Sequence, residues 1–409
     1  MTDASMDERS LFTDKGLGTA GRGVVGLNAL ADDIATPLMI VRRSALEANI
    51  ELLAAYCRRH DVLLAPHAKT TMSPGIVDRQ LRAGAWAITV ASVSQAIALG
   101  SHAGARILIA NEVVDPASIG WLNSTCGRSG LKVYCYVDSI EGARRLGGGI
   151  TSGVLDVLLE IGVPNGRCGV RSEADARSVV SAIAAQSSLR LVGVATFEGV
   201  IGIDRRDAQS EEAVRDFLSQ TRKIASALAS AGAFRGVESV LLTAGGSAYF
   251  DIVVDELSRP IPGINTKLVI RSGCYVTHDH GAIARLTPFR APDPTFRGAI
   301  EVLSSVLSCP EPGLAICDIG RRDVPFDAGL PVALWTKRRG SGAVKAADAI
   351  ELVRLNDQHG YLKLQHADLG VGDVISFGIS HPCTAFDKWR VIPLVDDNLD
   401  IVELIHTVF

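Results

Sequence analysis

One lysine lies in a position that is typical of a reactive amine. Lys69 belongs to the segment 63–74, LLAPHAKTTMSP, in which a short apolar run ends at a proline and a polar cluster that includes His67. A lysine at the carboxyl end of a buried strand is poorly solvated, which disfavours its charged form and frees a nucleophile for a Schiff base. A solvated loop lysine is the alternative, because most lysines are exposed. The strand-end position and the neighbouring histidine favour the reactive amine.

Two glycine-containing loops could bind an anion such as a phosphate. The segments are 243–251, TAGGSAYFD, and 271–281, RSGCYVTHDHG. Glycines let the backbone approach an anion closely, and barrels often bind phosphate in the loops after their last two strands. The candidate residues are Gly245, Gly246 and Ser247 in the first loop and Gly273, Cys274 and Tyr275 in the second. A plain glycine-rich turn is the alternative for the first loop.

An arginine and a histidine-rich stretch are further candidates. Arg167, in the segment GVPNGRCGV, follows another apolar run and should face the same end of the fold as Lys69. Its alternative role is structural, as the partner of a helix carboxylate. His278, Asp279 and His280 could form a metal cluster, but alternate positions on an exposed loop are more often merely polar.

A histidine and a cysteine near the C-terminus could bind zinc. His381 and Cys383 are two residues apart in SFGISHPCTAFDKW, so on an extended segment both side chains point to the same side. One zinc ion could then accept an imidazole nitrogen and a thiolate. A single such pair is a weak signal. Two protein ligands would leave positions open for water or substrate, as a catalytic zinc requires.

The elements that must position these residues form a regular series. Between residues 36 and 272, apolar runs alternate with segments that have helix signals, such as Ser44 with Glu47 in a capping-box spacing. The runs are 37–41, 62–65, 86–92, 106–111, 132–138, 154–163, 191–197 and 239–246. Continuous apolar runs indicate parallel strands buried on both faces, and eight units predict a (β/α)8 TIM barrel. An open doubly wound sheet is the alternative, but no strand with a GxGxxG fingerprint is present.

The rhythm changes after the barrel. From residue 286 onward, short strand-like runs are separated by Gly, Pro and Asp turns, which predicts a mainly antiparallel β domain. Residues 1–35 are polar and contain glycines. We therefore expect an α/β protein with a barrel at 36–272, and a β domain made of 1–35 plus 273–409 that carries the metal site.

Composition excludes several classes of function. The chain has 409 residues, of which 47% are hydrophobic and 21% charged, and a net charge of −4, which gives no support to a nucleic-acid partner. The eight cysteines show no CxxC spacing, and several lie in apolar runs, as reduced thiols of a cytoplasmic protein would. No signal peptide and no membrane span are expected from the sequence.

These motifs together resemble the fold-type III pyridoxal-phosphate enzymes, the alanine-racemase-like barrels. More narrowly, the chain is similar to the D-serine dehydratase and D-threonine aldolase branch. The resemblance covers nearly all of the chain from about residue 36. It rests on PHAKTT, GRCGV, the GGS loop, RSGCYV and above all HPCTAFDKW, while GRRDVPFDAGLP (320–331) resembles the bacterial D-serine-deaminase-like members.

The resemblance implies roles for the candidate residues. Lys69 would bind pyridoxal 5'-phosphate covalently and take the α-proton, with His67 beside it. Arg167 would face the pyridine nitrogen, and His381 and Cys383 would bind zinc or another divalent metal. The phosphate would be held by the two glycine loops, at Gly245, Gly246, Ser247, Gly273, Cys274 and Tyr275.

The implied reaction is loss of water from a β-hydroxy-D-amino acid. An arginine at the pyridine nitrogen keeps that nitrogen unprotonated, which makes the cofactor a poor electron sink, so elimination would be helped by a Lewis acid on the leaving hydroxyl. D-serine or a related substrate would give a 2-keto acid and ammonia. The alternative is D-threonine aldolase chemistry, in which relatives carry a carboxylate in place of the cysteine and a histidine where this chain has FEGVIG. Glu198 in that segment could itself be a base, or a solvated loop carboxylate.

Two other functions are less favoured. A pyridoxal-phosphate-binding regulatory protein would lack the β domain with its HPC segment. A racemase would need a second acid–base group, for which Tyr361 is available, but would not need the HPC segment. The resemblance also implies a homodimer, since in this family the active site lies between the barrel of one subunit and the β domain of another.

Overall fold

The computed structural model describes residues 14–126, 130–202, 205–338, 344–366 and 368–409. The first 13 residues of the expected polar lead-in lie outside this part of the chain. The described chain divides into two compact units. The barrel unit consists of Ile50–Tyr275 and Arg285–Thr295 with the last residue, and the β unit of the segment up to Asn49, Val276–Ala284 and Phe296–Val408. The domain limits expected from the sequence, 36–272 for the barrel and 1–35 plus 273–409 for the β domain, stay a prediction.

The barrel unit is built on a parallel sheet of eight strands within the described residues. In spatial order they are β2 (Leu63–Leu64), β9 (Thr266–Ile270), β8 (Val240–Ala244), β7 (Leu189–Thr196), β6 (Leu155–Ile161), β5 (Lys132–Val137), β4 (Arg106–Glu112) and β3 (Ile88–Val90). The sheet closes between β2 and β3, where the amide of Trp86 donates to the Leu64 carbonyl at 2.8 Å and that of Thr89 to the Pro66 carbonyl at 2.9 Å. The interior is filled by buried side chains such as Leu108, Leu158 and Val269.

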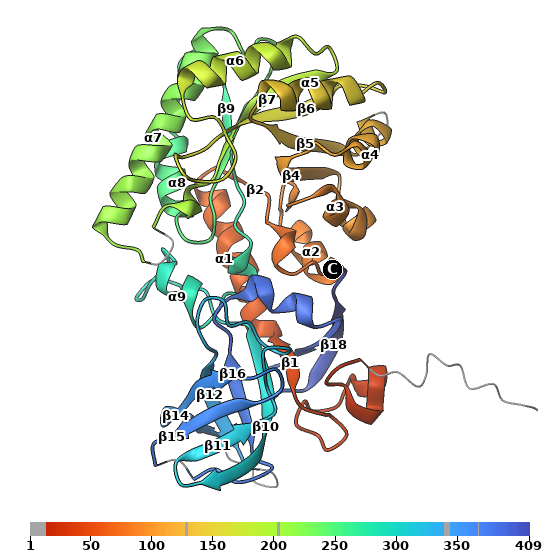
Figure 1. Ribbon diagram of the computed structural model, residues 1–409, viewed down its shortest axis with the longest axis vertical. Coiled ribbons are helices and arrows are strands. Elements are labelled where there is room, and N and C mark those ends of the chain that lie inside the picture. Colours follow the sequence, from red (N-terminus) through yellow and green to blue (C-terminus); the bar gives the residue numbers. More distant parts are fainter. Residues whose placement is uncertain (1–13, 127–129, 203–204, 339–343, 367) are drawn as a thin grey trace, which may run out of the picture. The chain divides into compact units, whose positions relative to one another are not determined.

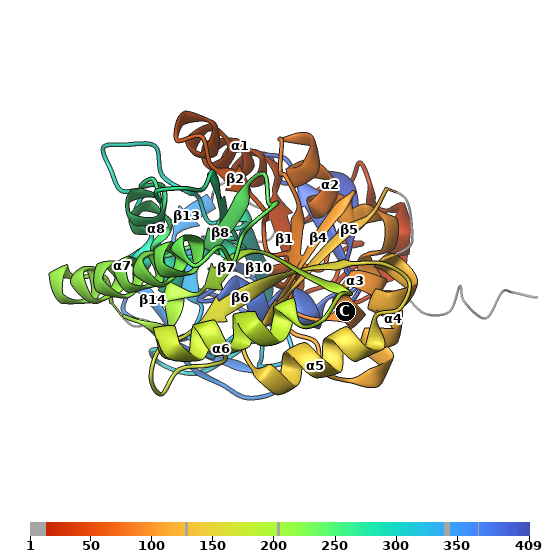
Figure 2. The ribbon, with the colours of Figure 1, turned by 90° about the horizontal axis from the view of Figure 1, so that it is seen from above.

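Helices follow the strands and lie on the outside of the curled sheet, as the view from above shows (Figure 2). They are α2 (Pro74–Arg82), α3 (Val93–Leu99), α4 (Pro116–Cys126), α5 (Ile140–Gly149), α6 (Glu173–Ala184), α7 (Ala208–Ser230) and α8 (Phe250–Leu257). Ser92, Ser139, Ser172 and Asp207 are N-caps that accept a backbone amide, which explains why α3, α5, α6 and α7 begin where they do. The short α9 (Ala282–Leu286) follows later, and α1 (Arg43–Arg59) connects the β unit to the barrel unit.

Two of the strands differ from the sequence expectation. The run 37–41 was the expected first barrel strand, but β1 (Leu38–Arg42) belongs to the antiparallel sheet, and β9 completes the barrel instead. An apolar run indicates that a strand is buried on both faces, but it does not indicate which strands pair with it. β1 is as deeply buried as a barrel strand, so its sequence looks the same. β9 was missed because it begins with Thr266 and Lys267, which are only half-buried.

This correction changes the positions of the loops in the barrel. Lys69 follows β2, the first barrel strand, and Arg167 follows β6, the fifth. The Gly245 loop follows β8, the seventh, and the segment 271–275 follows β9, the eighth. The two glycine loops therefore occupy the positions at which barrels often bind phosphate.

The β unit contains a sheet of ten strands in the described chain (Figure 1). Its main order is β13 (Val344–Ala346), β12 (Val332–Lys337), β16 (Val374–Gly378), β10 (Ile300–Glu311), β1, β17 (Val391–Val395) and β18 (Ile401–His406). A side branch adds β11 (Leu314–Cys317), β15 (Gly360–Leu364) and β14 (Ile350–Leu355). All pairs are antiparallel except β1 with β17, so the predicted fold class, a barrel followed by a mainly antiparallel β domain, is confirmed.

Among the described residues, none of the helices combines the length and the apolar composition that crossing a membrane requires.

Candidate active site

A cavity of about 180 Å³ opens at the carboxyl ends of the barrel strands. The sequence-predicted residues that line it are His67, Lys69, Arg167 and Gly245. Residues without a predicted role line it as well, namely Ala91, Ala110, Asn111, Tyr136, Glu160, Cys168, Phe197 and Arg271. The fold thus brings together groups that lie up to two hundred residues apart in the sequence, as expected for the catalytic end of such a barrel.

Lys69 lies in a single 3-10 turn, η3 (Ala68–Thr70), directly after β2. The turn is fixed because the amides of Thr71 and Met72 donate to the Ala68 carbonyl at 3.0 and 2.7 Å. Burial lowers the pKa of His67 well below its usual value, and the positive charges of Lys69 and Arg271 lower it further. His67 is therefore neutral beside the lysine.

Two arginines give the cavity a positive charge. The guanidinium of Arg167 lies over the ring of Phe197, 4.6 Å from its centre. Arg271 is 6% exposed and donates to Thr243 Oγ1 at 2.6 Å and to the Thr196 carbonyl at 2.7 Å. Sequence reasoning gave Arg271 no role, although it directly follows β9, a barrel strand. These cations suit an anionic ligand.

The first glycine loop is held by a carboxylate. Glu198, in the turn η5 (Glu198–Val200), is fully buried, and its two oxygens accept the amides of Gly245 at 3.0 Å and Gly246 at 2.7 Å. The alternative of a solvated loop carboxylate is therefore wrong, because this group is enclosed and bonded. The same bonds turn both amides toward Glu198, so neither is free to donate to a phosphate in this conformation, and Glu198 does not line the cavity.

Some of the predicted site residues have buried polar atoms without a hydrogen-bond partner, and one glycine has no room for a side chain. A bound ligand would explain both features. Within the described chain, Nδ1 of His67 and Oγ of Ser247 are buried and have no hydrogen-bond partner. Such atoms cost free energy unless something else pairs with them. A Cβ atom at Gly273 would lie 2.7 Å from Thr70 Oγ1, so only glycine lets the second loop approach the lysine turn. These features fit a polar, anionic cofactor.

Tyr275 attaches the second glycine loop to α2. Tyr275 is fully buried, and its hydroxyl accepts a hydrogen bond from Gln80 of α2 at 3.0 Å. Burial raises the pKa of Tyr275, so it stays neutral. Cys274 is half-buried in the adjoining turn. Neither residue lines the cavity.

In the β unit, the predicted metal pair has a partner that sequence reasoning missed. His381 Nδ1 lies 2.7 Å from Asp327 Oδ2, and Thr384 donates to Asp327 Oδ1 at 2.8 Å. The pKa of His381 is raised to about 9, first by a hydrogen bond with Cys383 and then by the charges of Cys383 and Asp327. A carboxylate on one imidazole nitrogen orients the other toward a metal, so the donor set of imidazole and adjacent thiolate fits zinc.

The histidine-rich stretch 278–280 has a structural role. The expectation of an exposed loop is wrong, since His278 is 3% exposed and Asp279 is 2% exposed. Asp279 accepts the amides of Gly281, Ile283 and Ala284 and so caps α9.

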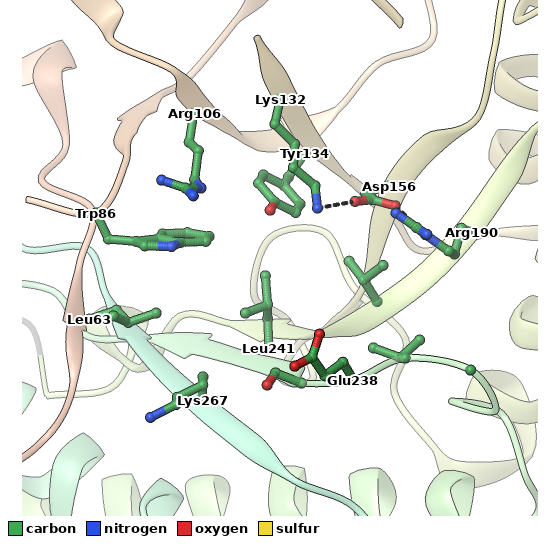
Figure 3. Close-up of a pocket in the computed structure, with 14 residues that line it drawn as sticks. Leu63, Trp86, Arg106, Lys132, Tyr134, Asp156, Arg190, Glu238, Leu241 and Lys267 are labelled. Carbon is green, nitrogen blue, oxygen red and sulfur yellow. Dashed lines mark hydrogen bonds and ion pairs between the residues drawn. The ribbon is translucent and has the colours of Figure 1, made fainter. Parts of the chain in front are cut away.

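A larger cavity of about 480 Å³ lies at the opposite, amino ends of the barrel strands (Figure 3). Lys132 and Arg190 approach Asp156 from two sides, at 3.0 and 2.6 Å, and Arg106 lies over the ring of Trp86. No predicted site residue lines it. Charged groups that pair with one another at this face of a barrel serve stability rather than chemistry.

Two family models match the chain. The model described as "Alanine racemase, N-terminal domain" matches residues 41–252, which is more than half of the sequence. The model described as "Putative serine dehydratase domain" matches residues 299–395 and includes the segment of His381 and Cys383.

Proteins of known identity are similar over most of their length. A D-threonine aldolase from Arthrobacter sp is 28% identical over 90% of this chain and 92% of its own. A 3-hydroxy-D-aspartate aldolase from Paracoccus denitrificans (strain Pd 1222) is 26% identical over 88% of each chain. The crystal structure of D-threonine aldolase from Filomicrobium marinum has a TM-score of 0.75 at 25% identity, covering 92% of this chain and 96% of that one. The D-threo-3-hydroxyaspartate dehydratase from Delftia sp. HT23 shares the fold, with a TM-score of 0.72 at 20% identity over 91% and 97% of the chains.

Proposed function

The chain belongs to the alanine racemase N-terminal domain family, and from this premise we propose that it is a pyridoxal-phosphate-dependent lyase of β-hydroxy-D-amino acids. The observation that carries the proposal is the cavity in which Lys69 lies beside a neutral histidine and two arginines, Arg167 and Arg271. Relatives that match most of the chain are aldolases of β-hydroxy-D-amino acids, which supports the substrate class.

We assign cofactor binding and proton transfer to different residues of the cavity. Pyridoxal phosphate, when bound, supplies an electron-withdrawing group that weakens the bonds to the substrate's α-carbon. Lys69 would hold it covalently and take the α-proton on Nζ, and neutral His67 leaves the lysine without a competing charged acid at its side. Arg167 would face the pyridine nitrogen. The unpaired hydroxyl of Ser247 would bind the phosphate. The two loops that would surround the phosphate contain Gly245, Gly246, Gly273, Cys274 and Tyr275.

The metal site would be formed by His381 and Cys383. Zinc or another divalent metal, when bound, supplies a Lewis acid for the substrate hydroxyl. Asp327 holds the imidazole through Nδ1, so Nε2 is the nitrogen left to bind the metal.

Within this class we propose dehydration, with D-serine or a related β-hydroxy-D-amino acid as substrate. Loss of water gives an aminoacrylate, which hydrolyses to a 2-keto acid and ammonia. Cys383 supports this, because aldolase relatives generally have a carboxylate in its place, which suits harder ions than zinc. Glu198, the alternative base for aldol cleavage, has both oxygens bonded to backbone amides.

Retro-aldol cleavage is the second candidate. It is favoured by the two curated relatives described above, which are aldolases and match about nine-tenths of the chain. In this reaction the products would be glycine and an aldehyde, and a base other than Glu198 would take the proton of the β-hydroxyl.

A product assay tests both reactions. The purified chain, with pyridoxal phosphate and zinc, is given D-serine, D-threonine and 3-hydroxy-D-aspartate, with the L-enantiomers as controls, and products are identified by mass spectrometry. Keto acid and ammonia from the D-substrates alone would support dehydration. Glycine and an aldehyde would establish the aldolase instead. No product from any D-substrate would refute the lyase.

We further propose that the protein is a homodimer, as the resemblance implies, and that it is cytoplasmic, as its cysteines without a disulfide pattern indicate. Sedimentation equilibrium of the purified chain measures the mass directly. A mass of one chain at all concentrations would contradict the dimer.

A further inference from the structure

Two glutamates meet at the edge of the candidate cavity and have no role in the proposed reaction. Glu112 ends β4 and lies in register with Tyr136 of β5, while Glu160 lies near the end of the next strand, β6. One oxygen of each carboxylate and the sulfur of Cys168 all lie within 4.8 Å of one another. Glu160 and Cys168 line the same cavity as Lys69.

The two carboxylates are buried without a donor from outside their own cluster. Glu160 is 9% exposed, and both oxygens of Glu112 are buried, with no described hydrogen-bond donor other than the neighbouring Glu160 carboxyl and Cys168 thiol. No described cation forms an ion pair with either carboxylate. Two ionised carboxylates at this separation, away from water, repel each other strongly, and one proton between them removes the repulsion and creates a hydrogen bond.

We propose that Glu112 and Glu160 share one proton, and that Glu160 presents this acidic group to the cofactor cavity. The shared proton leaves the pair with a single negative charge. Together with Arg167 and Arg271, the cavity then keeps a net positive charge, which suits a phosphorylated ligand. The shared proton rests on the burial and the closeness of the two carboxylates, whereas its effect on cofactor binding rests on the proposed function.

The groups that face the pair are consistent with this assignment. Burial first, then the hydrogen bond and charge of Glu112, raise the pKa of Glu160 to about 9, although Arg271 and Arg167 lower it. Burial raises the pKa of the Cys168 thiol to about 11, with Glu112 and Asp138 contributing. Burial also raises the pKa of Tyr136. Cys168 and Tyr136 therefore remain neutral at pH 7 and do not compete with the two carboxylates for the proton.

Infrared difference spectroscopy of the full chain tests the shared proton without any turnover. Wild-type protein at pH 7 should show the carbonyl stretch of a protonated carboxyl that is absent from Glu160→Gln and disappears as pH rises through about 9. In Glu112→Gln the band should disappear at lower pH, because the repelling charge is gone. Glu212→Gln, at an exposed glutamate of α7, is the control and should leave the band unchanged.

Two results would overturn the shared proton. One is a wild-type spectrum at pH 7 that is identical to that of Glu160→Gln. The other is a band that emerges only after a chelator is added, since a bound cation would then be what neutralises the pair.

A binding measurement tests the consequence for the cavity. Pyridoxamine phosphate carries the same phosphate but forms no covalent bond with Lys69, so its Kd reports non-covalent binding, and the change of this Kd with pH reports the charge of the cavity. The Kd in wild-type protein should rise about tenfold or more between pH 8 and 10, and Glu160→Gln should lose this step while retaining binding. A step that persists in Glu160→Gln would contradict the role of the pair. No binding in any variant at any pH would refute the pyridoxal-phosphate site and leave the infrared result to stand by itself.

Discussion

Lys69 is the residue on which the proposed chemistry depends. Lys69→Ala removes the amine that would bind the cofactor and take the α-proton, so turnover should fall by at least about 10²–10⁴-fold, the usual effect of losing a positioned acid–base group. The visible absorbance of lysine-bound pyridoxal phosphate should vanish too. Lys223→Ala, at an exposed position of α7, is the matched control. Absorbance of a lysine-bound cofactor that persists in Lys69→Ala would refute the assignment.

Asp327 is the partner that should set the orientation of the metal-binding histidine. Asp327→Asn keeps the size of the side chain but removes the charge that faces His381 Nδ1 at 2.7 Å. Zinc affinity should fall roughly 10–100-fold, as is typical when such an orienting carboxylate is lost. Competition with a fluorescent zinc chelator measures the change. Asp348→Asn, at an exposed site of the same unit, should have no effect, and equal affinities in both variants would contradict the role of Asp327.

Some site residues could be anticipated from the sequence and others could not, for a physical reason. Lys69, Arg167 and Gly245 each follow an apolar run, and the ends of parallel strands meet at one edge, so their shared cavity was predictable. Asp327 and Glu112 act through partners about fifty residues away, and nothing local marks such a pairing. From the sequence, Glu198 could be a base or a solvated carboxylate, because its acceptor role toward two backbone amides leaves no trace there.

At the scale of elements, Glu198 ties the turn after β7 to the loop after β8. Glu198→Ala would leave the buried amide of Gly245 without an acceptor, which costs about 1–3 kcal/mol, and would also free the part-buried amide of Gly246, which costs less. Glu198→Gln keeps one acceptor oxygen and should lose less. Urea titration measures the free energy of unfolding, with Glu212→Gln as the exposed control. A Glu198→Gln protein of wild-type stability that has lost all turnover would mean that Glu198 is the base after all.

The order of the strands was only partly predictable. The alternation of apolar runs and helix signals correctly indicates a barrel and then a β domain, because burial and periodicity are local properties. These local properties could not show that β1 belongs to the antiparallel sheet and that β9 completes the barrel. β1 pairs Leu38 with Leu303 and Val41 with Leu394, and such distant pairing depends on complementary surfaces rather than on the composition of the strand.

At the scale of the whole molecule, His278 should make the protein sensitive to acid. Burial first, and then His280, lower the pKa of His278 to about 4, against about 6.5 in an unfolded chain. Between these values the unfolded state binds the extra proton, so stability falls as pH drops from 6.5 to 4 and is unaffected above 6.5. The loss from this group is about 3 kcal/mol at most.

Replacing the histidine tests this expectation. His278 has a φ of +49°, a conformation that asparagine tolerates, so His278→Asn removes the titrating group with little backbone strain. Its free energy of unfolding should depend less on pH between 4 and 6.5 than that of wild type. His359→Asn, at an exposed histidine, should keep the wild-type slope, and equal slopes in all three proteins would contradict the prediction.

The pairing of β1 has a consequence for how the protein is made. A ribosome delivers about 5–20 residues per second, so β1 emerges tens of seconds before β17, its parallel partner, which begins at Val391. All strands of the barrel, by contrast, have been synthesised once Ile270 has emerged. The nascent chain therefore carries β1 as an apolar, unpaired strand while the barrel strands, which follow it in the sequence, are being synthesised. During translation this segment is the natural target for a chaperone that binds extended hydrophobic chain.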